Sequence, residues 1–134
     1  MLKGVSQIGI AVKDLDEAIK TYCEVLGAKL EEIQRAPEAG MAAAMLSVGS
    51  NKIELMEPIG TEGAIAKFLE SRGEGIQHIC IEVDDIDKTL ESLAEKGIRL
   101  IDEKARDGPE GWIAFIHPRS INGVLIELLE RSES

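Results

Sequence analysis

The pattern of apolar and polar residues in the first half of the chain predicts a strand, a helix and three more strands. Along residues 6–12, Ile and Val occupy one face of an extended strand, and Gln7 lies on the opposite face. A helical period of apolar residues begins near Asp14, and Gly27 is a typical helix end. The other three strands are predicted at residues 29–34, 41–48 and 52–57.

The second half of the chain repeats two sequence motifs of the first half. Gln7-Ile8-Gly9-Ile10-Ala11-Val12 returns as His78-Ile79-Cys80-Ile81-Glu82-Val83, and Lys52-Ile53-Glu54-Leu55 returns as Leu125-Ile126-Glu127-Leu128. The sequence therefore predicts two copies of one βαβββ module. The elements of the second copy are predicted at residues 76–83, 85–96 (the helix), 99–101, 112–117 and 124–129, with a loop over residues 102–111.

An apolar pattern over residues 60–73 predicts a short linker helix between the modules rather than a flexible tether. Each module is small, so the two are better stabilised by sharing a sheet. We therefore expect an α+β fold in which two tandem βαβββ modules form a curved mixed sheet around a metal-binding cleft. One domain would cover residues 1–134, with module one at about 4–58 and module two at about 75–131.

The charge of the chain excludes several classes of partner. The formal net charge is −10 at pH 7, whereas nucleic acids and anionic membranes attract clustered Lys and Arg. The sequence has neither a run of 18 apolar residues nor a charged and apolar leader, so we expect a cytoplasmic protein without a membrane span. Cys23 and Cys80 are expected to be free thiols without a chemical role.

Four polar side chains lie opposite the apolar stripes of their strands, and they occupy repeated positions. Gln7 and His78 lie on the first strands of the two modules, and Glu54 and Glu127 lie on the last strands. All four are expected to face the cleft. Two carboxylates, an imidazole and an amide oxygen suit a divalent ion such as Zn, Co, Ni or Mn, with positions left for substrate or water.

Five runs of residues, spread over nearly the whole chain, have the sequence of a known family. They are Gln7-Ile-Gly-Ile-Ala-Val-Lys-Asp-Leu, Ile65-Ala-Lys-Phe-Leu-Glu-Ser-Arg-Gly-Glu-Gly-Ile-Gln-His-Ile-Cys-Ile-Glu-Val-Asp-Asp-Ile, Arg99-Leu-Ile-Asp-Glu, Ile113-Ala-Phe-Ile-His-Pro-Arg-Ser and Gly123-Val-Leu-Ile-Glu-Leu. In these runs the chain resembles the methylmalonyl-CoA epimerase family of the vicinal oxygen chelate superfamily.

The resemblance implies an isomerase that interconverts (2R)- and (2S)-methylmalonyl-CoA. It would abstract the α-proton and pass through a metal-stabilised enolate, with Glu127 as the first choice for the base and Glu54 as its candidate partner. The resemblance also places His117 beside the substrate, and Arg119, with Lys104 and Arg106, is a candidate for binding the CoA phosphates. It further implies a homodimer.

The chain departs from the family pattern at three places, and two other functions stay open. Family members usually carry His at the position of Gln7, some carry a glutamate on the third strand, where residues 41–45 have none, and the usual Asp-Ser-Pro is Glu62-Gly63-Ala64 here. The donor order Gln, Glu, His, Glu resembles zinc-type glyoxalase I, a lactoylglutathione lyase. A metal-free small-molecule binding module on the same fold is the third alternative. Trp112 is expected in the core or in a dimer contact.

Overall fold

The computed structural model describes residues 1–132 of the chain, which separate into two compact units. The first unit spans Gln7–Gln77, and the second unit joins Met1–Ser6 to the chain from His78 onward. The single domain expected from the sequence stays a prediction. Among residues 1–132, no helix is both long and apolar enough to cross a membrane.

The first unit contains one complete strand–helix–three-strand module, as the sequence predicts. Strand β4 is parallel to β1 and antiparallel to β3, and β3 is antiparallel to β2. A π-helical turn at Thr21–Val25 extends the first helix. The elements are β1 (Leu2–Ala11, whose last five residues lie in this unit), α1 (Leu15–Lys20), β2 (Lys29–Ala36), β3 (Met41–Val48), β4 (Asn51–Pro58) and α2 (Ala64–Arg72).

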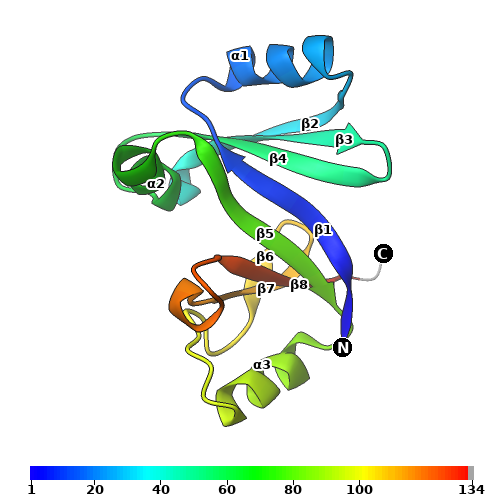
Figure 1. The fold of residues 1–134 in the computed structure, drawn as a ribbon, viewed down its shortest axis with the longest axis vertical. Coiled ribbons are helices and arrows are strands. Elements are labelled where there is room, and N and C mark those ends of the chain that lie inside the picture. The colour runs from blue at the N-terminus through cyan, green and yellow to red at the C-terminus, as the bar shows by residue number, and fades with distance from the viewer. Residues whose placement is uncertain (133–134) are drawn as a thin grey trace. The chain divides into compact units, whose positions relative to one another are not determined.

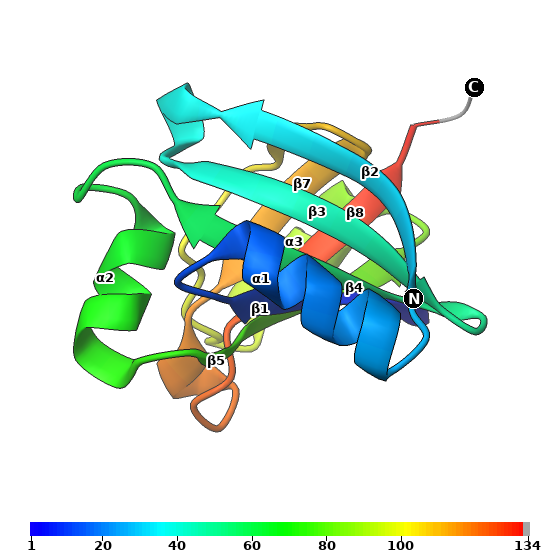
Figure 2. The ribbon, with the colours of Figure 1, turned by 90° about the horizontal axis from the view of Figure 1, so that it is seen from above.

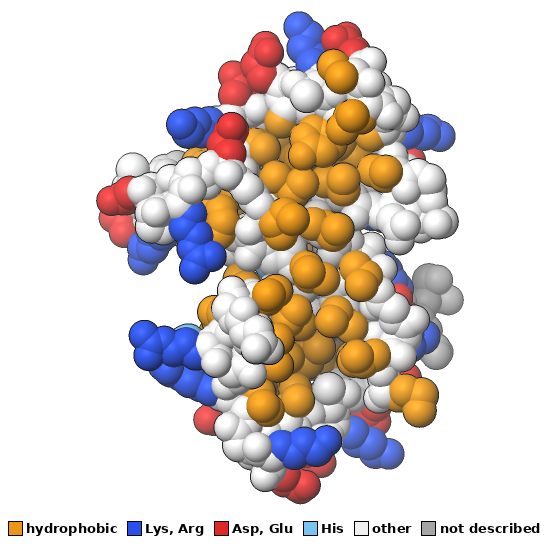
Figure 3. Space-filling model, in the orientation of Figure 1, with side chains coloured by type: hydrophobic (Ala, Val, Ile, Leu, Met, Phe, Trp, Pro, Cys, Tyr) orange, Lys and Arg blue, Asp and Glu red, His pale blue; other side chains and the backbone are white. Residues whose placement is uncertain are grey.

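Helices α1 and α2 pack on opposite faces of the first unit's sheet. Helix α1 lies along one face of this sheet (Figures 1 and 2). Its Leu15 packs with the fully buried Leu46 and Leu55, on the face where the sequence places the apolar stripe. Ile65 of α2 packs with Met56 on the other face. We call this second face the inner face of the first unit. In the view of Figure 3, hydrophobic side chains gather over β3 and β4.

The second unit repeats the module. Strand β5 is parallel to β8, and β7 is antiparallel to both β8 and β6. Helix α3 packs against β7 and β8, with Leu90 in a core that contains Ala114 and Leu128 (Figure 1). The elements are β5 (Gly75–Val83), α3 (Ile86–Glu95), β6 (Arg106–Gly108), β7 (Gly111–Ile116) and β8 (Ile126–Arg131).

The strand predicted at residues 99–101 is wrong, and so is the loop predicted over residues 102–111. Leu100 makes only an isolated bridge to Ile116, and the strand that pairs with β7 is β6, inside the predicted loop. Gly108 and Gly111 are opposite each other and close the β6–β7 hairpin. Gly111 has φ 151°, and a Cβ there would overlap the backbone carbonyl of Glu130, so this turn requires glycine.

Both modules fix the start of their helix with the same two carboxylates. Asp14 and Asp85 are the N-caps, and each accepts a hydrogen bond from a backbone N–H in the first turn at 3.1 Å. The penultimate residues of β4 and β8 each add a second bond. Glu57 accepts from the N–H of Leu15 at 2.9 Å, and Glu130 accepts from the N–H of Ile86 at 2.8 Å.

Arg131 at the end of β8 connects three segments of the second unit. Its guanidinium donates hydrogen bonds to Glu82 on β5, to Glu110 in the β6–β7 turn and to Ser6 on β1, at 3.1, 2.7 and 2.7 Å. Burial by itself raises the pKa of Glu82, but the hydrogen bonds and charges of Arg131 and Lys3 outweigh burial and hold this pKa below its ordinary value.

Candidate functional site

The second unit brings together two of the four predicted metal ligands. His78 on β5 is 4 % exposed, and its Nε2 lies 3.1 Å from Oε1 of Glu127 on the neighbouring β8. The two side chains share a face because β5 and β8 are parallel, with Cys80 opposite Glu127 in the register. Glu127 lies between Ile126 and Leu128, which pack in the core under α3, so it faces away from that helix. We call this face the inner face of the second unit.

A phenyl ring supports this pair. Phe115 on β7 lies directly opposite Glu127, and its ring meets the imidazole of His78 edge to face, with 6.1 Å between the centroids. Asp102 accepts a hydrogen bond from the N–H of Phe115 at 2.8 Å and also bonds Arg106 at 3.2 Å. The guanidinium of Arg106 lies 5.7 Å from the centroid of the same phenyl ring.

The sequence reasoning missed Phe115 and Asp102 as parts of this site. Strand parity could have found Phe115, since it lies two residues before His117 on a strand that pairs with the duplicated Ile-Glu-Leu. The role of Asp102 could not be predicted from strand parity. Its hydrogen bond to β7 depends on the path of an irregular segment.

The other two predicted ligands lie in the first unit. Gln7 on β1 is 6 % exposed and lies two residues before Gly9, which is opposite Glu54 on β4. Gln7, Gly9 and Glu54 therefore share the inner face of this unit, and Glu54 is half-buried there. Met45 on β3 is opposite Glu54 from the other side. The sequence prediction that Gln7 and Glu54 lie opposite the apolar stripe agrees with this register.

His117 and Arg119 come together in a short 3₁₀ turn at the end of β7 (Pro118–Ser120). Nδ1 of His117 accepts a hydrogen bond from the N–H of Arg119 at 3.1 Å. Partial burial, together with the positive charges of Arg99 and Arg119, lowers the pKa of His117 below its ordinary value. The imidazole is therefore neutral at pH 7, with Nδ1 as an acceptor.

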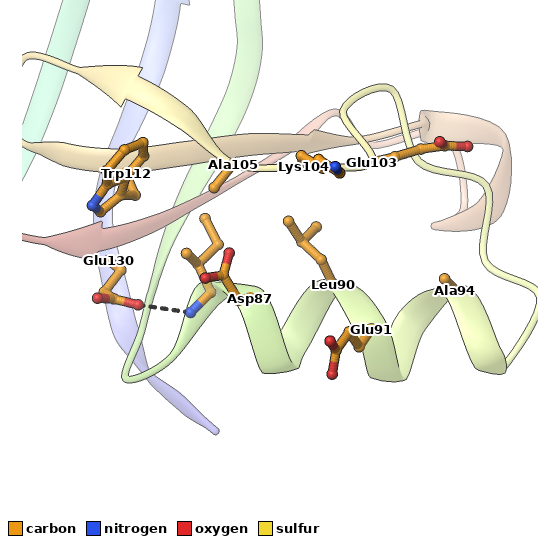
Figure 4. Close-up of a pocket in the computed structure, with 10 residues that line it drawn as sticks. Asp87, Leu90, Glu91, Ala94, Glu103, Lys104, Ala105, Trp112 and Glu130 are labelled. Carbon is orange, nitrogen blue, oxygen red and sulfur yellow. Dashed lines mark hydrogen bonds between the residues drawn. The ribbon is translucent and has the colours of Figure 1, made fainter.

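A groove of the second unit lies beside α3, on the face of the sheet away from Glu127. It has a volume of about 630 Å³, with Leu90 of α3 on one side and Ala105 and Trp112 on the other (Figure 4). Trp112 is 45 % exposed, so it is not a core residue. Lys104 also lines this groove, whereas Arg106 lies over Phe115, so these two cations do not form one patch.

Within residues 1–132, no group of three or more His, Cys, Asp and Glu side chains is close enough to hold a metal ion. The pair of His78 and Glu127 nevertheless has the donor types that a divalent ion needs. Metal bonds of about 2.1 Å at right angles separate adjacent ligands by about 3.0 Å, close to the observed 3.1 Å between Nε2 and Oε1. This pair therefore fits two adjacent positions of a metal site.

Comparison with known proteins agrees with the fold and the duplicated strands. The sequence model of the glyoxalase/bleomycin resistance protein/dioxygenase superfamily matches residues 6–115. A mitochondrial methylmalonyl-CoA epimerase of Bos taurus is 39% identical over 92% of this chain and 72% of that protein. An ethylmalonyl-CoA/methylmalonyl-CoA epimerase of Cereibacter sphaeroides is 37% identical over 96% of this chain and 98% of that protein. The chain belongs to the methylmalonyl-CoA epimerase family.

Solved structures of epimerases share the fold over almost the whole chain. The methylmalonyl-CoA epimerase of Mycobacterium tuberculosis is 41% identical, with a TM-score of 0.91 and coverage of 98% of this chain and 90% of that chain. A methylmalonyl-CoA epimerase in complex with methylmalonyl-CoA and NH4+ is 32% identical, with a TM-score of 0.91. The predicted α+β fold of the vicinal oxygen chelate superfamily is confirmed.

Members of this superfamily, including the epimerases, generally use a divalent metal ion. The superfamily also includes lyases. A probable lactoylglutathione lyase of Synechocystis is 30% identical over 92% of this chain and 92% of that protein. The epimerases are the more similar group, with identities of 36 to 39% for the mammalian enzymes.

Proposed function

We propose that this member of the epimerase family interconverts (2R)- and (2S)-methylmalonyl-CoA with the help of a divalent metal ion. The observation that carries the proposal is the contact between the buried His78 and Glu127 on the inner face of the second unit, at 3.1 Å. The geometry of this pair fits a metal ion. A solved structure of a related epimerase in complex with methylmalonyl-CoA supports the choice of substrate.

The proposed metal ligands are His78 and Glu127 in the second unit and Gln7 and Glu54 in the first unit. The set mixes one imidazole nitrogen, two carboxylates and an amide oxygen, which suits Zn, Co, Ni or Mn. A divalent ion bound by these residues would act as a Lewis acid toward the thioester oxygen and stabilise the negative charge that develops when the α-proton leaves.

Glu127 is our first choice for the base that removes the α-proton, and Glu54 is its candidate partner. The carboxylate of Glu127 has two oxygens, so Oε2 can take a proton while Oε1 stays beside His78. The edge-to-face contact with Phe115 restricts the imidazole of His78, which in turn fixes the position of Oε1.

The turn that contains His117 and Arg119 would bind the substrate. Arg119 is exposed, and its charge and that of Arg99 both act on His117. Guanidinium groups are well suited to bind phosphate. We therefore propose that this turn binds the phosphates of the CoA portion.

The decisive test is exchange of the α-proton in deuterated water. Wild-type protein supplied with Co, Zn, Ni or Mn is expected to exchange the α-proton of (2S)-methylmalonyl-CoA and to form the (2R) epimer. Glu127→Gln should lower this rate by about 10² to 10⁴. His78→Gln should also lower the metal bound per chain, measured by elemental analysis. No exchange by the wild type with any of the four metals would reject the proposal.

The donor set supports a second candidate, a glyoxalase I-type lactoylglutathione lyase. The order Gln7, Glu54, His78 and Glu127 matches that of zinc-type glyoxalase I, and the Synechocystis relative is a probable lactoylglutathione lyase. Conversion of the methylglyoxal–glutathione adduct distinguishes the two activities. A Gln7→His variant, which restores the usual epimerase ligand, should raise only the epimerase rate.

We further propose a cytoplasmic homodimer. Cys23 and Cys80 do not form a disulfide, which is typical of a reducing compartment. Leu2 and Val5 on β1 are 61 % and 54 % exposed and offer apolar surface for association. Sedimentation equilibrium of wild type and of a Val5→Asp variant would test the dimer, which the substitution should weaken.

A further inference from the structure

Arg106 and Arg131 both lie on the inner face of the second unit, but they use their hydrogen-bond donors differently. All three guanidinium nitrogens of Arg131 donate hydrogen bonds to other residues of this unit. Arg106 donates only through Nε, to a carboxylate oxygen of Asp102 at 3.2 Å. Among residues 1–132, its two terminal nitrogens have no hydrogen-bond partner. Arg106 therefore offers donors that the protein itself does not use.

Strand pairing places Arg106 on the same face as His78 and Glu127. Arg106 is opposite Ile113 on β7, and Phe115, farther along β7 on the same face, is opposite Glu127. Residues that are opposite each other, or that alternate along one strand, point to the same side of a sheet. The guanidinium carbon of Arg106 lies 5.7 Å from the ring centroid of Phe115, which lies 6.1 Å from that of His78. A single phenyl ring therefore separates this cation from a proposed metal ligand.

Asp102 and Phe115 hold the guanidinium of Arg106 in one orientation. One oxygen of Asp102 accepts from Nε of Arg106, and the other accepts from the N–H of Phe115 at 2.8 Å. Asp102 is thereby tied to β7 on the Nε side of the guanidinium, and the phenyl ring adds a cation–π contact. The end of the guanidinium stays open. Its two parallel N–H groups have the geometry that binds a carboxylate through both oxygens.

We propose that Arg106 binds the free carboxylate of the acyl group and so determines substrate specificity, an inference that rests on the proposed function. In methylmalonyl-CoA this carboxylate is bonded to the α-carbon. A thioester bound at His78 and Glu127 would therefore present it close to these two side chains. The CoA phosphates lie at the far end of the long pantetheine arm, so they are not the anions that meet a cation one ring away from His78. Arg106 would thus favour malonyl-type thioesters over simple acyl-CoA molecules.

The charge of the substrate gives this contact its physical importance. The chain has a formal net charge of −10, so an anionic acyl group needs a local cation to offset the repulsion. Removal of the α-proton adds negative charge beside the carboxylate, and a guanidinium held in place stabilises that charge. Arginine stays protonated throughout, so Arg106 exchanges no proton with the substrate and adds no reactant to the step.

The test compares the binding of malonyl-CoA and acetyl-CoA, which differ only in the free carboxylate. Isothermal titration calorimetry on the metal-loaded full chain should show that the wild type binds malonyl-CoA more tightly. Arg106→Gln should weaken malonyl-CoA binding by at least about tenfold and leave acetyl-CoA binding unchanged. Arg106→Lys keeps the charge but loses the paired donors, so it should give an intermediate affinity for malonyl-CoA.

Lys104→Gln is the matched control. It removes the same charge from the same segment, but Lys104 lines the groove beside α3, on the other face of the sheet. This variant should bind both ligands as the wild type does. An equal effect of Lys104→Gln and Arg106→Gln on malonyl-CoA would overturn the inference, because it would show a general effect of charge.

The remaining outcomes separate this inference from the proposed function. Equal weakening of both ligands by Arg106→Gln overturns the inference, because a structural defect or a contact with the CoA portion acts on both alike. Unchanged binding of malonyl-CoA by Arg106→Gln, or a wild type without preference for malonyl-CoA, also overturns it. A wild type that prefers malonyl-CoA but does not exchange the α-proton of (2S)-methylmalonyl-CoA rejects the epimerase and leaves the carboxylate site in place.

Discussion

The two glutamates at the penultimate positions of β4 and β8 should stabilise their helices equally. Glu57 bonds the N–H of Leu15 at 2.9 Å, and Glu130 bonds the N–H of Ile86 at 2.8 Å, and both carboxylates are half-buried. Each bond satisfies a first-turn N–H that has no partner within its helix. We therefore expect Glu57→Ala and Glu130→Ala to lower the free energy of unfolding by similar amounts.

The magnitude follows from the kind of bond that is lost. A hydrogen bond to a charged group contributes about 1.5 to 3 kcal/mol, and loss of a helix cap costs about 0.5 to 2 kcal/mol. Because both carboxylates are half-buried, we expect each alanine variant to lose about 1.5 kcal/mol of unfolding free energy, a value that lies within both ranges. Glu57→Gln and Glu130→Gln keep an acceptor oxygen and lose only the charge at the positive end of the helix, so each should cost about 0.5 kcal/mol.

Urea denaturation and amide hydrogen exchange measure this effect. The alanine variants should shift the urea midpoint, and the N–H of Leu15 or of Ile86 should exchange about tenfold faster in the variant that lacks its acceptor. Glu62→Ala removes an exposed loop glutamate and is the control, with an expected change within about 0.5 kcal/mol. The reasoning is refuted if both alanine variants match Glu62→Ala, or if only one of the two helices responds.

Three further outcomes are expected. Gly111→Ala should destabilise the second unit by more than about 3 kcal/mol in urea denaturation, because the new Cβ would overlap a backbone carbonyl. Gly27→Ala has open space around it and should cost about 1 kcal/mol. Equal losses of stability for the two variants would contradict the clash at Gly111. Arg131→Gln should cost about 1 kcal/mol at pH 7. The pKa of Glu82 is lower in the folded than in the unfolded protein, so its contribution to stability is present above the unfolded pKa and is lost as pH falls through the folded pKa. The stabilities of wild type and Arg131→Gln should therefore converge in acid. A stability difference that is independent of pH would contradict this. Arg119→Gln should raise the pKa of the neighbouring imidazole in an NMR titration, and an unchanged value would show that the guanidinium charge does not reach it.

The elements with strict alternation or a clear helical period could be predicted from the sequence. The apolar stripe that includes Ile10 does pack with α1, and Asp14 and Asp85 do begin their helices. Strand β6 could not be predicted, because Arg106–Gly108 has no alternation and is defined only by its pairing with β7. Its identity depends on a partner strand, which local patterns do not contain.

The same distinction applies to the candidate site. Parity predicts which face Glu127 occupies, because that depends only on the strand that carries it. The contact between His78 and Phe115 depends on the register between strands. The register between two strands can shift by one residue without any change in their composition, so the register could be established only from the structure.

β1 is one unbroken strand, yet Met1–Ser6 belongs to the second unit and the rest of the strand to the first. If the chain were divided between the two duplicated halves, the N-terminal fragment would contain all of β1. The other fragment would lose Ser6, to which Arg131 donates a hydrogen bond. The halves of the sequence repeat therefore do not coincide with the two compact units, and a second half separated from Met1–Ser6 would lose this hydrogen bond.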